Sequence, residues 1–356
     1  MKINNESICI NYPSPTLAIV HSNVRDDIIY CLCKNAYLIQ INTETKEVNQ
    51  IMPLKLDKID FEKSISLQLS DQDNLISITN SKGKVGCIYN LVLKEIALTL
   101  DRKDYNTEQT YFPIKFLTIN NLDYLIHATD WNHLEIFDFK LKKNLTERTT
   151  NKYVEGKKNE LYLDYFYGQL HLSPSKKWLL SSGWNWHPVS SLKFIDFNKW
   201  MNESKFEPEK ENDANRIIMS NYWDRALCWI DDDTIAYIFD PMEEDIDKEE
   251  IVEGGYEIDT SYIMIYDVSK AEIKQKIKFN EYSKNEYFEA TPDCRMYFDG
   301  SILISSIEKG LFILNKDSGD ILFHSPKTSL SQYNKKNNLF YKLIRNKDIE
   351  IVRIST

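Results

Sequence analysis

Residues 64–100 read SISLQLSDQDNLISITNSKGKVGCIYNLVLKEIALTL. Four short apolar runs, Ser64–Ser70, Leu75–Thr79, Val85–Asn90 and Glu95–Leu100, alternate with joints made of Asn, Asp, Ser, Lys and Gly. Such runs are typical of β-strands, and such joints are typical of tight turns. No helical period continues through the stretch. We therefore expect one antiparallel sheet of four strands.

The ending of the third run recurs along the chain, where an apolar stretch stops at an Asn or Asp before a polar turn. These polar ends lie at Asn42, Asn90, Asp138, Asp196, Asp267 and Asn315, with spacings of 48, 48, 58, 71 and 48 residues. In four of the six, an aliphatic residue returns six positions later, at Val48, Ile96, Ile273 and Ile321. Sheets of four strands at this period are the signature of propeller blades.

Counting the repeats predicts seven blades within a single domain, residues 1–356. The C-terminal repeat supplies only three strands, and the lone strand Ser7–Ile10 provides its fourth. The fold class is therefore all-β, a seven-bladed β-propeller of four-stranded antiparallel blades, closed by the N-terminal strand pairing with the C-terminal blade. The predicted blades are 16–53, 64–100, 112–148, 165–202, 224–278, 294–324, and 329–354 together with 7–10.

The composition and net charge of the chain limit the kinds of partner that it can bind. Hydrophobic residues make up 42% of the chain, enough for a packed core. The chain contains no run of 18 apolar residues, which is about the length needed to cross a membrane. The net charge of -10 argues against nucleic acid, which requires a basic surface. The six cysteines show no Cys-x-x-Cys pair and are interpreted as reduced thiols. Without a secretory signal, we expect cytoplasmic residence.

One hairpin carries a resemblance to a known superfamily. Residues 172–183 read LSPSKKWLLSSG, which resembles the Ser-Pro-Asp-Gly-Lys-x-Leu-x-Ser-Gly hairpin of the WD40-like propellers. The strand ends at Asp138, Asp196 and Asp267 stand where those proteins carry Trp-Asp. No Trp-Asp occurs at these ends, Gly-His dipeptides are absent, and Ser175 replaces the usual Asp. The resemblance implies the architecture and transfers no functional residues.

The wide spacings place extra residues in particular loops. They fall in Thr149–Leu163, Gly183–Ser190, Asn198–Tyr222 and Asp240–Ser261. In a propeller, loops from the second to the third strand share a face with loops that join consecutive blades. All four loops therefore map to one face over blades 3 to 5, and long loops on a rigid scaffold are where binding residues concentrate.

These loops, together with the turn Thr129–His133 of blade 3, are rich in aromatic and polar side chains. Trp and Tyr anchor many protein interfaces, so we expect a partner-binding surface here. The alternative is that the tryptophans pack the loops onto the propeller. The candidate binding residues are Trp131, His133, Trp184, Trp186, His187, Tyr222 and Trp223.

The sequence gives little indication of a metal site or of a catalytic site. Asp245, Asp247 and Glu249 have the alternate spacing that opens a calcium loop, but Glu250 stands where the loop needs Gly. A solvated acidic loop is the preferred interpretation. No nucleophile elbow, phosphate loop, zinc-protease or dinucleotide motif occurs, so no catalytic residue and no cofactor is predicted. His21, His127 and His324 are isolated within predicted strands, and nothing near them in the sequence indicates a functional role.

The sequence thus favours a non-enzymatic scaffold that binds a protein through the loop-rich face over blades 3 to 5. Two alternatives stay open. One is a hydrolase or lyase acting on a sugar or small ester, with its site at the mouth of the central channel. The other is a lectin-like propeller that binds carbohydrate. The high Asn, Lys and Ile content is compatible with an AT-rich bacterial genome.

Overall fold

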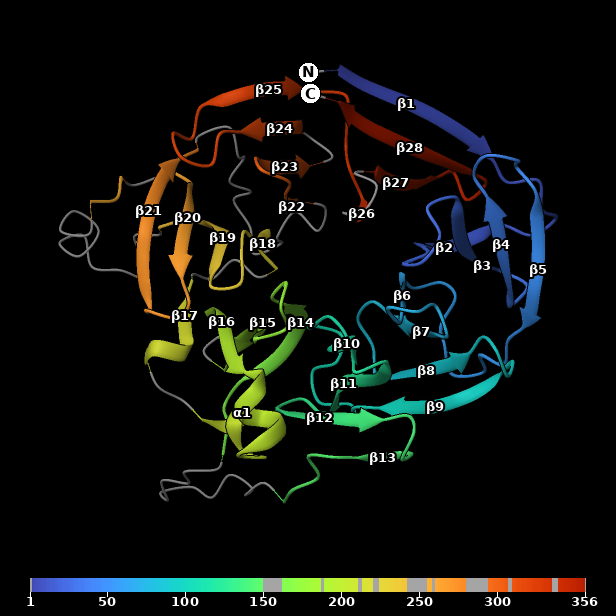
Figure 1. The fold of residues 1–356 in the computed structure, drawn as a ribbon, viewed down its shortest axis with the longest axis horizontal. Coiled ribbons are helices and arrows are strands. Elements are labelled where there is room, and N and C mark those ends of the chain that lie inside the picture. Colours follow the sequence, from blue (N-terminus) through green and yellow to red (C-terminus); the bar gives the residue numbers. More distant parts are fainter. Residues whose placement is uncertain are drawn as a thin grey trace. The chain divides into compact units, whose positions relative to one another are not determined.

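The protein is an all-β, seven-bladed β-propeller, and every blade is a four-stranded antiparallel sheet (Figure 1). This confirms the fold class that the repeat predicted. The computed structural model describes residues 2–149, 162–186, 189–210, 213–219, 224–241, 255–257, 260–279, 294–306, 309–334 and 339–355.

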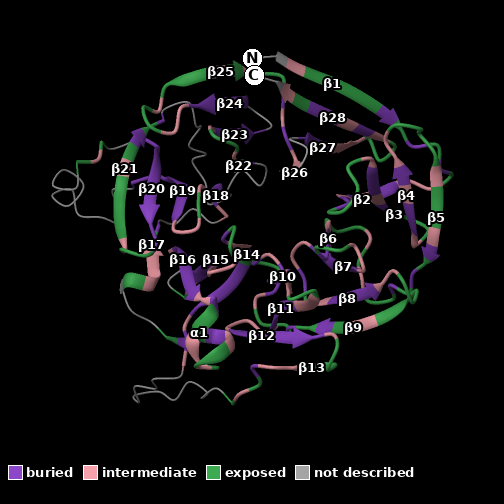
Figure 2. Cartoon of the chain, viewed as in Figure 1, coloured by how far each residue is buried: buried purple, intermediate pink, exposed green. Residues whose placement is uncertain are grey.

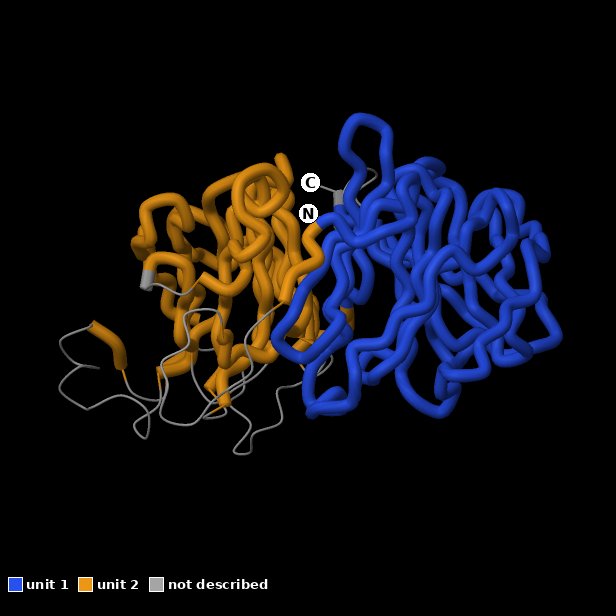
Figure 3. Tube along the Cα trace, turned by 90° about the horizontal axis from the view of Figure 1, so that it is seen from below, with its two compact units in different colours: residues 1–145, 330–356 blue, residues 146–329 orange. Residues whose placement is uncertain are grey.

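The chain divides into two compact units, which are coloured separately in Figure 3. Unit 1 consists of Met1–Leu145 and Leu330–Thr356, and unit 2 consists of Thr146–Ser329. Unit 1 holds blades 1, 2, 3 and 7, and unit 2 holds blades 4, 5 and 6. The expectation of a single domain stays a prediction.

In unit 1, three blades are simple meanders in which each strand pairs with the next along the chain. Blade 7 has the order β1-β28-β27-β26, so its outermost strand comes from the N-terminus and is longer than the predicted Ser7–Ile10. The strands are β1 (Lys2–Cys9), β2 (Thr16–His21), β3 (Ile28–Cys33), β4 (Tyr37–Asn42), β5 (Val48–Pro53), β6 (Ile65–Leu69), β7 (Leu75–Asn80), β8 (Val85–Asn90), β9 (Glu95–Asp101), β10 (Ile114–Ile119), β11 (Leu122–Asp130), β12 (His133–Asp138), β13 (Lys143–Asn144), β26 (Gln332–Asn334), β27 (Leu339–Ile344) and β28 (Asp348–Ser355).

In unit 2, all three blades are meanders, and short helices follow the third strand of blade 4. The elements are β14 (Phe166–Leu172), β15 (Trp178–Asn185), β16 (Val189–Asp196), α1 (Phe197–Asn202), the 3-10 turns η1 (Glu207–Glu209) and η2 (Asp213–Asn215), β17 (Arg216–Ile218), β18 (Leu227–Trp229), β19 (Thr234–Phe239), β20 (Tyr262–Asp267), β21 (Glu272–Lys278), β22 (Arg295–Phe298), β23 (Ile302–Ser306), β24 (Gly310–Leu314) and β25 (Ile321–Ser325). No helix among the described residues is long and apolar enough to cross a membrane.

Apolar contact between neighbouring sheets forms the core. Leu32 and Leu38 of blade 1 belong to the same buried cluster as Ile76 and Ile78 of blade 2. Both faces of a middle strand are covered in this way, which explains continuous apolar runs such as Ile263-Met264-Ile265. Figure 2 shows the same gradient, with buried middle strands and largely exposed fourth strands.

The recurring polar ends have a structural reason. In blade 2, the Asn90 side-chain oxygen accepts hydrogen bonds from the backbone N–H groups of Val92 and Leu93, both at 2.9 Å. Such an Asx turn reverses the chain between the third and fourth strands. The same pair of bonds is made by Asn42, Asp138, Asp267 and Asn315 in their own blades.

The backbone of these turns is equally repetitive. In five blades, the residue four positions after the polar end has a positive φ, between 53° and 77°. This left-handed conformation returns the chain to the sheet, and it suits glycine best. Only blade 6 has glycine there; the five residues are Lys46, Lys94, Lys142, Ala271 and Gly319. The 48-residue period seen in the sequence therefore reflects one type of turn, which recurs between the third and fourth strands of successive blades.

Blade 4 departs from this pattern. Asp196 caps the N-terminus of α1, since its side-chain oxygen accepts from the Lys199 N–H at 3.0 Å. The chain then runs through η1 and η2 before β17 pairs with β16. The fourth strand of this blade therefore lies at Arg216–Ile218, beyond the predicted boundary at residue 202.

Polar turns also join neighbouring blades within each unit. In unit 1, the Ser22 hydroxyl and the Asn23 N–H both donate to the Asp73 carboxylate in the first turn of blade 2. The Asn23 amide nitrogen also donates to Ser70 O at 3.0 Å. In unit 2, the Trp178 indole N–H donates to Asp233 at 2.8 Å. These bonds tie the first turn of one blade to that of the next.

The Asx turns can be tested in blade 2. Asn90→Ala removes the acceptor for two backbone N–H groups, so we expect the free energy of unfolding to fall by about 1–2 kcal/mol. Asn90→Asp should be much milder, because Asp138 and Asp267 make the same turn. The measurement is the urea midpoint. Asn49→Ala, an exposed asparagine on β5, is the control, and equal midpoints for the two alanine variants would contradict the role of the turn.

Candidate functional site

The residues predicted to bind a partner do not all lie within the described part of the chain. Trp131 and His133 belong to unit 1, and Trp184 and Trp186 belong to unit 2. His187, Tyr222 and Trp223 lie outside the described residues, as do the calcium candidates Asp245, Asp247 and Glu249. The described residues contain no group of three or more His, Cys, Asp or Glu that could hold a metal ion.

An aromatic column stands at the end of blade 4. Phe166 of β14 and Trp184 of β15 stack with their ring centroids 3.8 Å apart and an interplanar angle of 1°. Trp186 lies beside both rings, at 6.1 Å from Phe166 and 6.4 Å from Trp184. Phe166 and Trp184 are buried, whereas Trp186 is 51% exposed. The column therefore has a core-like base and one ring that faces solvent.

The backbone beneath this column is tightly packed. A Cβ atom on Gly183 would lie 2.1 Å from Phe166 O, so only glycine fits between β14 and β15. The buried Tyr165 hydroxyl donates to Ser181 O at 2.9 Å in the same hairpin. The register of the two strands shifts between Phe166 and Gln169. The hairpin that carries Trp184 and Trp186 is thus fixed by close packing.

Buried ion pairs anchor two of the predicted loops of unit 2. The Arg148 guanidinium donates twice to the Glu209 carboxylate, and both side chains are almost fully buried. Asp240 pairs with Arg225 at 2.5 Å and accepts a hydrogen bond from Ser261. Asp240 and Ser261 are the two ends of a predicted loop, so this bond joins the base of that loop. Removing one partner of such a pair leaves a buried charge uncompensated.

In unit 1, Trp131 lies in a second aromatic contact. Its ring centroid is 5.4 Å from that of Tyr105, which is 47% exposed. The backbone N–H of Trp131 donates to the Asp130 carboxylate at 2.9 Å. Lys103 binds Asp130 at 2.5 Å. Sequence reasoning missed Tyr105 and Lys103, because the loop that carries them joins two blades of normal spacing.

Arg102 holds that loop in place. Its side chain is almost fully buried and makes hydrogen bonds to Gly83 O, Thr107 O, Tyr111 O and both oxygens of Thr110. Burial lowers the pKa of Arg102 to about 10, and the guanidinium stays charged at neutral pH. Four of these five hydrogen bonds go to the loop that carries Tyr105, which explains why Tyr105 is presented on a fixed backbone.

His133 lies in the interior. It is 8% exposed, and its Nε2 is 2.7 Å from the Glu135 carboxylate. His127 lies opposite Glu135 in the register of β11 and β12. These side chains form a buried polar group inside blade 3, so His133 is not part of an exposed surface.

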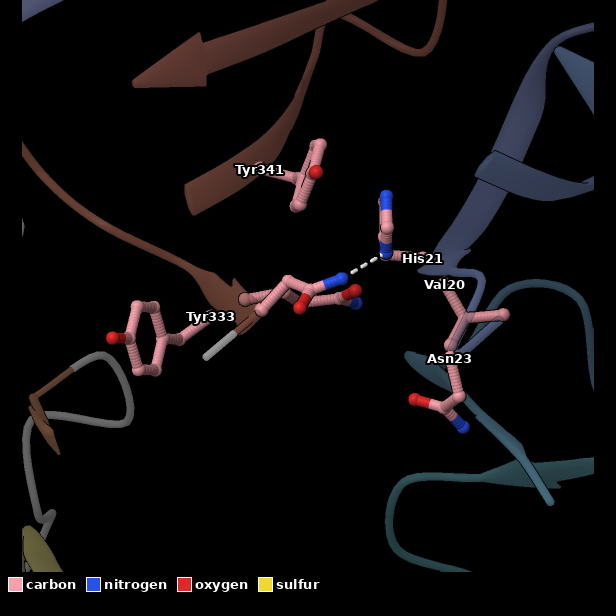
Figure 4. A pocket seen from close by; sticks show the side chains of 7 residues that line it. Val20, His21, Asn23, Tyr333 and Tyr341 are labelled. Carbon is pink, nitrogen blue, oxygen red and sulfur yellow. Dashed lines mark hydrogen bonds between the residues drawn. The ribbon is translucent and has the colours of Figure 1, made fainter. Parts of the chain in front are cut away.

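Sequence reasoning also passed over a pocket in unit 1. A cavity of about 310 Å³ lies between blade 7 and blade 1, lined by residues of β2, the turn after it, β26 and β27 (Figure 4). His21 and Asn334 line it and hydrogen-bond to each other although 313 positions separate them. No local pattern in the sequence connects these residues.

The imidazole of His21 is fixed on three sides. Its Nε2 donates to Asp26 O at 3.1 Å, Asn334 donates to its Nδ1, and its ring stacks on Tyr341 at 4.6 Å. Burial lowers the pKa of His21 and also that of His127 in blade 3. Both imidazoles are therefore neutral at physiological pH.

This predicts a loss of stability in acid. The unfolded chain takes up protons at the ordinary histidine pKa, whereas the folded chain takes them up at a lower pH. Stability is therefore complete above the ordinary histidine pKa of about 6.5 and is lost as the pH falls below that value and through the lower folded-state pKa values. The urea midpoint measured as the pH is lowered through these values should fall less in His21→Asn and His127→Gln than in the wild type. Asn49→Ala should keep the wild-type dependence, and an unchanged slope in both histidine variants would contradict the assignment.

The two tryptophans of blade 4 should differ in their effect on folding. Trp184→Ala empties a buried site and should lower the free energy of unfolding by about 3–5 kcal/mol. Trp186→Ala, at an exposed position, should change it by less than about 1 kcal/mol. Urea denaturation of the two single variants measures both values. Equal losses would show that Trp186 packs as a core residue.

Compared with models of protein families and with curated protein sequences, the chain matches none. The class of the protein is defined by its fold, a seven-bladed β-propeller. Its two candidate sites are the aromatic column of blade 4 and the pocket of unit 1.

Proposed function

We propose that the protein is a non-enzymatic binding scaffold that holds a protein partner against the end of blade 4, with Trp186 as the anchor. The observation that carries the proposal is the column described above. Trp186 exposes half of its surface while its ring rests beside the stacked pair of Phe166 and Trp184.

Two physical arguments favour a protein partner. Exposed tryptophans supply large contact areas and are enriched among the residues that dominate binding energy. A side chain that is already held in place also loses little conformational entropy when a partner binds. The close packing at Gly183 fixes the backbone of the hairpin that carries Trp186.

Finer assignments follow the same proposal. We place the chain among the WD40-like propellers, supported by the Asx turns at the strand ends where those proteins carry Trp-Asp. The net charge of -10 supports a partner other than nucleic acid or an anionic membrane. Cytoplasmic residence and the hydrolase or lyase alternative stay predictions from the sequence.

The proposal is tested with Trp186→Ala. Proteins captured by the immobilised wild-type chain are identified, one is purified, and its affinity is measured by calorimetry. Loss of an anchoring tryptophan should weaken binding at least tenfold, which corresponds to about 1.4 kcal/mol. Thermal unfolding should be nearly unchanged.

Ile273→Ala on β21 is the matched control, because Ile273 is also an exposed apolar residue of unit 2, at 44%. It should bind the partner with the wild-type affinity. If both variants bind as the wild type does, blade 4 is not the binding surface.

A further inference from the structure

The pocket of unit 1 suggests a second binding activity, separate from the proposed protein-binding surface. We propose that it binds a neutral, hydroxyl-rich small molecule of about the size of a single sugar ring. The inference depends on residues of blades 1 and 7 and does not require the function proposed for blade 4.

The lining of the pocket, in the part of the chain that the structure describes, is polar and carries no formal charge. Its side chains are amides, tyrosines, one valine and His21, which burial keeps neutral. A charged ligand leaving water requires a countercharge or a dense set of hydrogen bonds. Since none of the described residues that line the cavity is a lysine, an arginine or a carboxylate, the pocket favours an uncharged ligand.

Two amide groups present acceptors to the cavity. Gln332 Nε2 donates to Ile19 O at 2.7 Å, and Asn23 Nδ2 donates to Ser70 O at 3.0 Å and Leu69 O at 3.3 Å. Backbone carbonyls can only accept, so the nitrogen of each amide must face the protein and the oxygen must face away. Among the described residues, no hydrogen bond reaches Gln332 Oε1 or Asn23 Oδ1. Ligand hydroxyl groups are suitable donors to both oxygens.

The rest of the pocket is organised before any ligand arrives. Asn334, His21 and Tyr341 form a continuous set through one hydrogen bond and one ring stack. Tyr333 stacks on Phe340, with ring centroids 4.6 Å apart. Figure 4 shows His21 and Asn23 on one side of the cavity and Tyr333 on the other. His21 acts here as a positioning residue, since both of its ring nitrogens are used within the protein.

The volume limits the size of the ligand. At about 310 Å³, the cavity lies at the small end of the range of roughly 300–1,000 Å³ that is usual for small-molecule sites. It accommodates one ring with its hydroxyl groups, whereas an oligosaccharide or a folded peptide would extend beyond it. Aromatic side chains beside amides suit such a ring, which has apolar C–H faces and polar edges.

The test is saturation-transfer NMR on the full chain with glucose, galactose, mannose, N-acetylglucosamine and myo-inositol at millimolar concentrations. Glucose 6-phosphate and glucosamine serve as the anionic and cationic counterparts. At least one neutral compound should bind, and its charged counterpart should bind more weakly. No transfer to any neutral compound, or preference for a charged one, overturns the proposal.

Two variants locate the binding. Asn23→Ala and Gln332→Met each remove one acceptor, and each should weaken binding about tenfold. Asn23 lies in an exposed turn, and Gln332→Met keeps the length of the side chain, so folding is checked for both by circular dichroism. Asn49→Ala should bind as the wild type does.

Trp186→Ala separates the two proposals. It should weaken binding of the protein partner at least tenfold and leave binding of the small molecule unchanged. Wild-type affinity for the small molecule in both folded pocket variants would show that the compound binds elsewhere, and the pocket assignment would then be wrong. Failure of the protein capture alone leaves the pocket result standing.

Discussion

Burial of both faces of each middle strand is the constraint on which this structure depends. A four-stranded sheet such as β6 to β9 has apolar side chains on two sides, and it is stable only when another sheet covers each side. Polar groups inside such contacts must therefore find partners within the protein. Arg102, with five hydrogen bonds, and the pair of Arg148 and Glu209 show how the protein meets that requirement.

The fold was largely predictable because its information is local. A hydrogen bond from a backbone N–H of the turn to the side-chain oxygen of an Asn or Asp repeats every 48 residues where loops are short, and this spacing is visible without coordinates. Blade 4 was harder to delimit. Asp196 begins a helix instead of an Asx turn, and β17 is only three residues long, too short to show an alternating pattern.

The candidate sites were less predictable, since they depend on contacts that the sequence does not record. The tryptophan cluster of the sequence directed attention to blade 4, but only the structure distinguishes the buried Trp184 from the exposed Trp186. No pattern in the sequence indicated the pocket of unit 1. His21 and Asn334 come from opposite ends of the chain, and a lone histidine in a strand looks the same whether it lines a cavity or fills the core.

Asn23 connects two parts of the protein through one side chain. Its nitrogen bonds to carbonyl oxygens of blade 2, and its oxygen belongs to the pocket between blades 7 and 1. A ligand that bonded to that oxygen would polarise the amide and strengthen the bonds on its other end. Binding of the proposed ligand would therefore link occupancy of the pocket thermodynamically to cohesion between blades 1 and 2, so that local opening of these blades would weaken the binding.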